Sequence, residues 1–209
     1  MSSSWTWVEC SSCGAKTISG KYCMRCGRPL APQTKKESPP KYVYHFNIIV
    51  VGEDGVGKTT LINSMVGPGQ VLQPSPQGFG VLKRVRSDAF EINFGLKELD
   101  GVMKLQQKAD AALVVFEVPS RATFLKAVQY VKKIREEHPE ILVYMIGNKS
   151  DQVNRQVSYT EASKSSEELK SKYLETVATL GHNVETLTRK LLKDLLTKRA
   201  EVLRGLLTK

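Results

Sequence analysis

From residue 42 onward, apolar residues follow the periods of β-strands and α-helices in alternation. Runs rich in β-branched residues predict strands at 44–51, 81–86, 89–94, 111–118, 141–146 and 173–178, the second and third forming a hairpin. Helical spacing predicts helices at 58–66, after the cap Ser120, from Thr160 and Glu161, and at 183–207, with a weak, short helical region at 95–109. This order predicts an α/β fold with a mostly parallel, doubly wound sheet and helices on both faces.

The first 41 residues do not continue this alternation. Residues 1–30 contain all four cysteines and predict a small separate module, whose apolar cover would be Trp5, Trp7, Tyr22 and Leu30. Residues 31–41 are polar and carry prolines, which is typical of a linker. We therefore expect a module at 1–30, a linker at 31–41 and an α/β domain at 42–209.

The cysteines form two C-x-x-C-G knuckles, Cys10-Ser-Ser-Cys13-Gly and Cys23-Met-Arg-Cys26-Gly. Two such knuckles supply four thiolates for a tetrahedral zinc ion, and each glycine allows the tight turn that aims backbone N–H groups at sulfur. A redox pair or two disulfides are the alternatives, and both fit poorly in a cytosolic protein. We expect a zinc ribbon that folds only with its metal, because so short a segment cannot bury a core.

A glycine-rich turn separates the first predicted strand from the first predicted helix. It reads Gly52-x-x-x-x-Gly57-Lys58-Thr59, the spacing of a phosphate-binding P-loop in the strand–loop–helix setting that this motif requires. Its glycines let the backbone wrap a phosphate, Lys58 adds a positive charge for the β- and γ-phosphates, and the Thr59 hydroxyl can bind Mg²⁺. The candidate phosphate-binding residues are Asp54, Gly55, Val56, Gly57, Lys58, Thr59 and Thr60. An ordinary glycine-rich turn is the alternative.

A second polar motif, Asn148-Lys149-Ser150-Asp151, follows the strand predicted at 141–146. Open α/β sheets bind ligands at the carboxyl ends of their strands. The Asp151 carboxylate could accept hydrogen bonds from both the ring N1–H and the exocyclic amine of guanine, a pairing that adenine cannot match. Asn148 can reach the other base edge, and the Lys149 stem can lie over the ring. A surface turn could carry these letters by chance, but the P-loop upstream makes a guanine site the better interpretation.

With these two motifs, the chain resembles the small GTPases of the Ras superfamily, Rab- and Ras-like members most of all. The resemblance covers about residues 43–200 and leaves out the ribbon. It implies a P-loop GTPase fold that binds GTP or GDP with Mg²⁺. The stretch Tyr173-Leu-Glu-Thr-Val-Ala178 is similar to the family's late loop, in which an alanine amide contacts the guanine oxygen, although Val177 and Thr179 replace that loop's usual Ser and Lys.

The two switch motifs of the family are degenerate in this chain. No threonine occurs between Thr60 and Thr123, so the Mg²⁺-binding threonine of the first switch is missing, and Ser75 is the nearest hydroxyl. The second switch normally begins D-x-x-G followed by glutamine; here Asp100-Gly101 has the wrong spacing, and Gln106 and Gln107 come too late. These residues position metal and water during phosphoryl transfer, whereas the P-loop holds the nucleotide. We expect nucleotide binding with slow or absent hydrolysis.

The charge and the chain ends bear on partners and location. The formal net charge is +10, spread along the chain, which fits either a polyanionic partner or a solvated basic surface. No apolar run reaches the ~18 residues of a membrane span, and no signal peptide or lipid-anchor cysteine is present. We therefore expect a cytoplasmic protein without a membrane span or lipid anchor.

Two classes of function fit these features. The first is a GTP-binding switch or scaffold that contacts a protein partner through its ribbon, its switch surface or an overhanging C-terminal helix. The alternative is an RNA- or ribosome-associated GTP-binding factor that uses ribbon and basic charge on a polyanion. The ribbon lacks an aromatic stacking array, which favours the first hypothesis.

Overall fold

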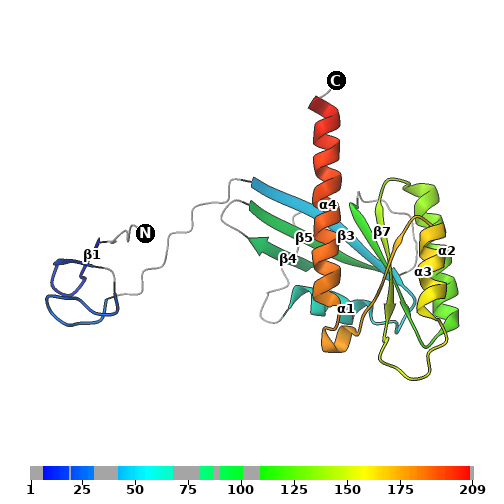
Figure 1. Cartoon of the computed structure of the whole chain (residues 1–209), viewed down its shortest axis with the longest axis horizontal. Helices are drawn as coiled ribbons and strands as arrows, with labels where there is room; N and C mark the ends of the chain where they lie inside the picture. Colours follow the sequence, from blue (N-terminus) through cyan, green and yellow to red (C-terminus); the bar gives the residue numbers. More distant parts are fainter. Residues whose placement is uncertain are drawn as a thin grey trace. The chain divides into compact units, whose positions relative to one another are not determined.

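A computed structural model describes residues 7–18, 20–30, 42–67, 81–86, 90–100 and 109–207. The chain divides into two compact units, Met1–Pro39 and Pro40–Lys209, each of which is described by itself. The predicted linker at 31–41 lies outside the described residues. The larger unit is the α/β part of the chain (Figure 1).

The larger unit is built on a six-stranded sheet with the strand order β4-β5-β3-β6-β7-β8. The strands are β3 (Tyr42–Gly52), β4 (Val81–Arg86), β5 (Phe90–Asp100), β6 (Ala111–Glu117), β7 (Leu142–Asn148) and β8 (Lys172–Glu175). All neighbouring pairs are parallel except β4 and β5, which form the predicted antiparallel hairpin. The prediction of a mostly parallel α/β sheet is confirmed.

Helices cover both faces of this sheet (Figure 1). They are α1 (Lys58–Val66), α2 (Arg121–Glu137), α3 (Tyr159–Glu168) and α4 (Val184–Leu207), with a 3₁₀ turn η1 (Ala178–Leu180). Apolar side chains of α1 and α4 share one buried cluster with one face of the sheet, and those of α2 and α3 share a second cluster with the other. Ser120 caps α2 as predicted; Ser158, whose hydroxyl accepts a hydrogen bond from the Glu161 backbone N–H, caps α3.

The buried residues that the structure describes on α4 lie in the first half of the helix. Val184, Leu187, Leu191 and Leu195 recur at helical spacing and are buried. Figure 1 shows the rest of α4 continuing past the sheet edge, where Val202 is 52% exposed. The side chains of Leu203, Leu206 and Leu207, which were expected to overhang, lie outside the description.

A partly exposed polar contact adds to the apolar packing of α4. The Tyr144 hydroxyl on β7 and the Lys172 ammonium on β8 both donate to the Asp194 carboxylate on α4. Burial by itself would raise the pKa of Asp194, but the hydrogen bonds from Lys172 and Tyr144 outweigh it and lower that pKa. Asp194 therefore stays ionised in the folded state and ties α4 to two strands.

Two predicted element boundaries are wrong. The weak helical region at 95–109 does not form over its first part, because residues 95–100 continue β5 and pair with β3 as far as Gly52↔Asp100. Pairing with a neighbouring strand overrides the weak local preference of this segment. Residues 101–108 lie outside the description. The last strand ends at Glu175 rather than 178, and Ala178 begins η1.

The smaller unit has a short antiparallel ladder between β1 (Trp7–Glu9) and β2 (Lys16–Ile18). Its buried cluster consists of Val8, Cys10, Cys23 and Leu30. Trp7 and Tyr22 are 66% and 62% exposed, so the prediction that they cover this module is wrong; Trp5 lies outside the description. Three-residue strands are too short to bury an indole ring, and the cysteines form much of the core instead.

Within the described part of the chain, no helix combines the length and the hydropathy of a transmembrane span.

Candidate functional site

The P-loop (residues 52–60) joins β3 to α1 at the carboxyl edge of the sheet. Gly55 and Gly57 have φ angles of 78° and 96°, in the left-handed region that favours glycine. A Cβ on Gly52 would lie 2.3 Å from the Val115 carbonyl oxygen, and one on Gly57 would lie 2.4 Å from Asn148 Nδ2. The loop therefore needs glycine at these positions, and its backbone N–H groups and the amino terminus of α1 form a concave cradle suited to an anion.

Lys58 is held inside this cradle, with a side chain that is only 4% exposed. Its Nζ donates to the carbonyl oxygens of Gly52 at 3.0 Å and Glu53 at 3.1 Å. The carboxylates of Asp54 and Glu98 lie 3.6 and 3.7 Å from the same nitrogen. The carbonyl oxygens of the P-loop therefore fix the position of the Lys58 ammonium within that loop.

Thr59 has a carboxylate partner that the sequence analysis did not identify. Its hydroxyl donates to Glu98 Oε2 at 2.7 Å. Glu98 lies near the carboxyl end of β5, two residues before Asp100, which pairs with Gly52. The stretch Glu98-Leu-Asp-Gly101 has D-x-x-G spacing with Glu in place of Asp, so a search that allowed either acid would have found it.

The second motif is bonded directly to the P-loop. The Asn148 amide is buried and donates to the Val56 carbonyl oxygen at 2.9 Å. Its Oδ1 accepts from the Ala178 backbone N–H at 3.1 Å and from the Thr176 hydroxyl at 3.2 Å. One side chain therefore connects three loops that the sequence separates by up to 122 positions (56 to 178).

Lys149 makes a second connection to the P-loop. Its Nζ donates to the Gly55 carbonyl oxygen at 2.8 Å and forms an ion pair with Glu117. Lys149 also has a positive φ of 57°, which turns the chain sharply after β7. Asp151 follows in an exposed turn, where its carboxylate is accessible to a ligand at the carboxyl edge.

Hydrogen bonds to Glu175 hold the segment that leads into the loop of Ala178. Arg155 bonds both oxygens of the Glu175 carboxylate, at 2.8 and 2.9 Å, and the Tyr173 hydroxyl donates to the same group at 2.8 Å. Burial alone would raise the pKa of Glu175, but the bonds from Arg155 and Tyr173 outweigh it and lower that pKa. The ion pair between Arg155 and Glu175 therefore connects the segment that follows Asp151 to the segment that precedes Ala178.

The P-loop is also bonded to α2. The Tyr130 hydroxyl donates to the Glu53 carboxylate, and this bond, together with burial, raises the pKa of Tyr130 to about 12. Tyr130 therefore stays protonated at neutral pH, and its hydrogen bond to Glu53 connects the P-loop to α2.

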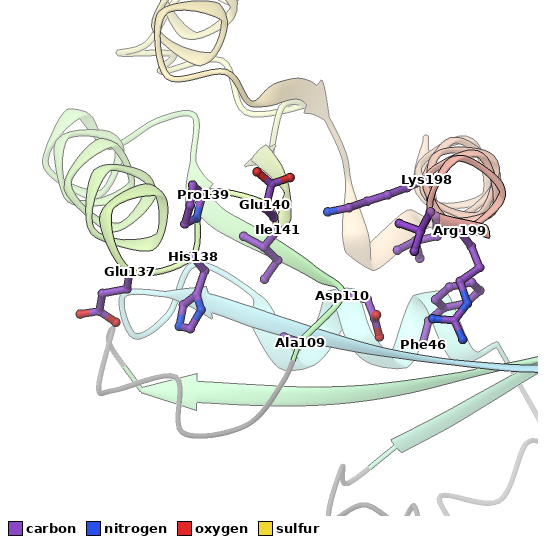
Figure 2. Close-up of a pocket in the computed structure, with 12 residues that line it drawn as sticks. Phe46, Ala109, Asp110, Glu137, His138, Pro139, Glu140, Ile141, Lys198 and Arg199 are labelled. Carbon is purple, nitrogen blue, oxygen red and sulfur yellow. The ribbon is translucent and has the colours of Figure 1, made fainter. Parts of the chain in front are cut away.

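A separate concavity lies at the opposite edge of the sheet. This cavity of about 340 Å³ lies between α4 and the segment joining α2 to β7, beside Asp110 and Ile141 at the amino ends of β6 and β7 (Figure 2). Because the P-loop and Asn148 follow the carboxyl ends of their strands, this cavity is not part of the site described above.

In the smaller unit, the four cysteine sulfurs lie within 4.8 Å of one another. The Cys10–Cys26 and Cys13–Cys23 sulfur distances are 3.7 and 3.8 Å, far beyond the ~2.05 Å of a disulfide bond. A tetrahedral zinc ion with Zn–S bonds of ~2.3 Å separates its sulfurs by about 3.8 Å. The donor set and its spacing therefore fit zinc.

The cysteine turns have the geometry that the sequence predicts. Gly14 and Gly27 have φ angles of 66° and 69°. Backbone hydrogen bonds, that from Ser12 above all, lower the pKa of the Cys10 thiol to about 6, and backbone bonds from Cys26 and Arg25 lower the pKa of Cys23. At Cys13 a backbone bond from Ala15 also favours the thiolate, but burial and the neighbouring thiols outweigh it and raise the pKa to about 11. Thiolates are the form in which cysteine binds metals.

Comparison with known proteins agrees with this geometry. A sequence model of the Ras family matches residues 101–197. The chain is 32% identical over 157 residues to the Ras-related protein Rab11D of Lotus japonicus, covering 69% of this chain and 72% of the relative. It is 29% identical over 167 residues to the Ras-related protein Rab-17 of Homo sapiens, covering 75% and 79%. It is 28% identical over 169 residues to the GTP-binding protein GEM of Mus musculus, covering 74% and 57%. The chain belongs to the Ras superfamily of small GTP-binding proteins.

Proposed function

We propose that this chain is a guanine-nucleotide-binding switch or scaffold that hydrolyses GTP slowly or not at all and uses a zinc ribbon to dock a protein partner. The observation that carries the nucleotide site is the position of Asn148, bonded at once to Val56 of the P-loop and to the loop of Ala178. A side chain in this position fixes the distance between a phosphate cradle and a base-binding loop. Such preorganisation favours one ligand of fixed length.

The phosphates would lie in the P-loop. Backbone N–H groups of residues Asp54 to Thr60 would surround the β-phosphate, and Lys58 would neutralise the β- and γ-phosphates. The base would lie beside the edge formed by Asn148, Lys149, Asp151 and Ala178. The exposed Asp151 carboxylate supports guanine over adenine, because it accepts from two donors that only guanine presents together.

Magnesium fits the oxygen donors next to the phosphates. In P-loop proteins the ion is bound by the Ser or Thr after the lysine and by an acid on a neighbouring strand. Thr59 would supply the hydroxyl, and Glu98 near the end of β5 would supply the carboxylate. When bound, the ion would offset the repulsion between the negative charges of the phosphates and of the carboxylate.

The slow hydrolysis follows from the residue types at the switches. The residue after Gly101 is not the glutamine that the second switch motif has at this position. The region of Ser75, the nearest hydroxyl for the first switch, lies outside the described residues. Asp54, fully exposed beside Lys58, would crowd an arginine that a partner brought toward the γ-phosphate. Bound GTP would then not be converted to GDP, and a nucleotide that binds only the folded state stabilises the fold by mass action.

Single-turnover hydrolysis of bound GTP tests this point. We expect a rate at least about tenfold below the roughly 4 × 10⁻⁴ s⁻¹ typical of intrinsic Ras hydrolysis, because the second-switch sequence lacks the glutamine that would orient the attacking water. Rapid-quench or chromatographic assay of GDP in the preloaded protein, with and without added Mg²⁺, gives the rate. A rate within the ordinary small-GTPase range would show that other groups perform this role.

The ribbon is proposed as the docking element. Four thiolates leave zinc no open coordination position, so the ion would have a structural rather than a catalytic role. The exposed side chains of Trp7, Tyr22 and Met24 support this assignment, because aromatic and methionine side chains are favoured at protein interfaces. The switch surface and the projecting half of α4 are further candidate contacts. No observation on the described residues favours the RNA-associated alternative.

A further inference from the structure

We propose that Tyr130 is a positioning residue for the nucleotide: its hydrogen bond to Glu53 holds the P-loop in its phosphate-binding shape and slows nucleotide release. This inference rests on the proposed nucleotide site and concerns how long that site keeps its ligand. Tyr130 lies on α2, outside both the P-loop and the base-binding motif (residues 148–151). Its hydroxyl donates to the carboxylate of Glu53, 77 positions earlier in the chain.

Glu53 connects this hydrogen bond to the phosphate-binding lysine. Its backbone carbonyl oxygen accepts from Lys58 Nζ at 3.1 Å, while its carboxylate accepts from the Tyr130 hydroxyl. Because both acceptors belong to one residue, a displacement of Glu53 would also remove a hydrogen-bond partner from the ammonium. Tyr130 would therefore act on the phosphates through Glu53 and Lys58.

The P-loop needs contacts of this kind because its glycines adopt left-handed φ angles, and glycine populates either sign of φ with similar ease. The base-binding motif holds the later part of the loop, where Lys149 and Asn148 donate to backbone carbonyl oxygens. Tyr130 holds the earlier part, at Glu53, from a different element of the fold. Loss of this contact would leave the first turn of the cradle free to open.

Core packing sets the position of the Tyr130 hydroxyl. The ring is partly buried against the cluster to which Ala127, Val131 and Ile134 of the same helix contribute. A tyrosine side chain has only two χ torsions, so a packed ring leaves its hydroxyl little freedom. The bond to Glu53 and burial raise the pKa of Tyr130 to about 12, so the hydroxyl remains a donor at neutral pH.

The helix α2 is also fixed near the base-binding motif. The Arg121 backbone N–H donates to Gln156 Oε1 at 3.0 Å, and the Arg121 guanidinium lies 2.8 Å from the Glu161 carboxylate. Gln156 follows the proposed guanine-binding residue Asp151 by five positions. One helix therefore contacts segments on the base side and on the phosphate side of the proposed site, and Tyr130 makes the contact on the phosphate side.

A second tyrosine–carboxylate pair provides a matched control. The Tyr144 hydroxyl on β7 donates to the Asp194 carboxylate on α4, and neither residue belongs to the P-loop or to the base-binding motif. Tyr144→Phe removes the same chemical group as Tyr130→Phe. It should lower the thermal midpoint of the larger unit without changing nucleotide release.

The test is the dissociation rate of a fluorescent GDP analogue from the zinc-loaded full chain in Mg²⁺, measured after addition of excess unlabelled GDP. For Tyr130→Phe we expect release at least about fivefold faster than for the wild type. A hydrogen bond to a charged group contributes about tenfold or more to an equilibrium constant, and solvent weakens it at the half-buried Glu53. In a Glu53→Ala background, Tyr130→Phe should change the rate by less than about twofold, because the acceptor is absent.

Phosphorus NMR of bound GDP supplies a readout that a loss of stability alone would not change. The β-phosphate resonance should shift in Tyr130→Phe, because Lys58 loses its fixed position. In Tyr144→Phe the resonance should stay in place, and the release rate should remain within about twofold of the wild type.

The possible failures are distinguishable. A wild-type chain that does not bind the analogue even with Mg²⁺ would overturn both the proposed function and this inference. If the wild type binds it, a smaller than about fivefold acceleration or an unmoved β-phosphate resonance in Tyr130→Phe would overturn this inference alone. The same holds if Tyr130→Phe accelerates release equally with and without Glu53, which would indicate an effect of ring packing. Equal acceleration by Tyr144→Phe would also overturn it, as a general loss of stability.

Discussion

Replacing Asp151 with asparagine should weaken GTP binding by about 100-fold or more and shift the preference of the site toward xanthosine triphosphate. Each hydrogen bond to a charged group contributes ~1.5–3 kcal/mol, and two such bonds are lost. Asparagine can instead donate to the carbonyl that xanthine carries in place of the guanine amine. Calorimetric titration with both nucleotides in the presence of Mg²⁺ measures the change.

Asp54→Asn is the control for this experiment, because it removes an exposed carboxylate from the same edge without touching the base loop. It should leave the GTP-to-xanthosine-triphosphate ratio unchanged. If Asp151→Asn bound GTP as tightly as the wild type does, Asp151 would not read the base, and the assignment of residues 148–151 would fail.

Removal of zinc should unfold the ribbon and leave the nucleotide domain intact. The core of the ribbon is the cluster Val8, Cys10, Cys23 and Leu30, which is too small to persist once its thiolates repel one another. The larger unit has its own two apolar clusters. We expect one zinc per chain by metal analysis, and chelation should collapse the amide NMR dispersion of residues 7–30 with little change elsewhere.

Cys26→Ser should reproduce the effect of chelation, whereas Ser12→Ala, within the first knuckle, should retain the metal. Persistent NMR dispersion of the ribbon after complete chelation under reducing conditions would contradict a zinc-dependent fold. If the NMR dispersion of the ribbon were lost on reduction alone, in the presence of zinc, this result would support the disulfide alternative instead.

The parts of the site that the sequence predicted best are those whose chemistry is local. Gly57, Lys58 and Thr59 must be adjacent because a backbone turn, a charge and a hydroxyl converge on one phosphate, and the structure has them at the start of α1. The same holds for Cys10 and Cys13, whose sulfurs one turn brings into a cluster that fits a single metal ion. Buried parallel strands were equally clear, since their β-branched runs have few polar interruptions.

The features that sequence reasoning missed depend on partners that are distant in the chain. Residues 97–100 have weak strand character alone and form a strand because β3 pairs with them. Glu98 acquires its importance from Thr59, 39 positions away, and Tyr130 acquires its bond to the P-loop from Glu53, 77 positions away. In the ribbon, the aromatic residues were assigned to the core by residue type, whereas the available space was too small for them.

Titration of the nucleotide-free full chain with GTP, GDP and ATP in the presence of Mg²⁺ tests whether the chain binds guanine nucleotides selectively. We expect dissociation constants at or below the micromolar range for GTP and GDP, and at least about 100-fold weaker binding of ATP, which lacks the donors from which Asp151 accepts hydrogen bonds. A chain that ignored GTP and GDP alike at micromolar concentrations, or that bound ATP equally well, would contradict it.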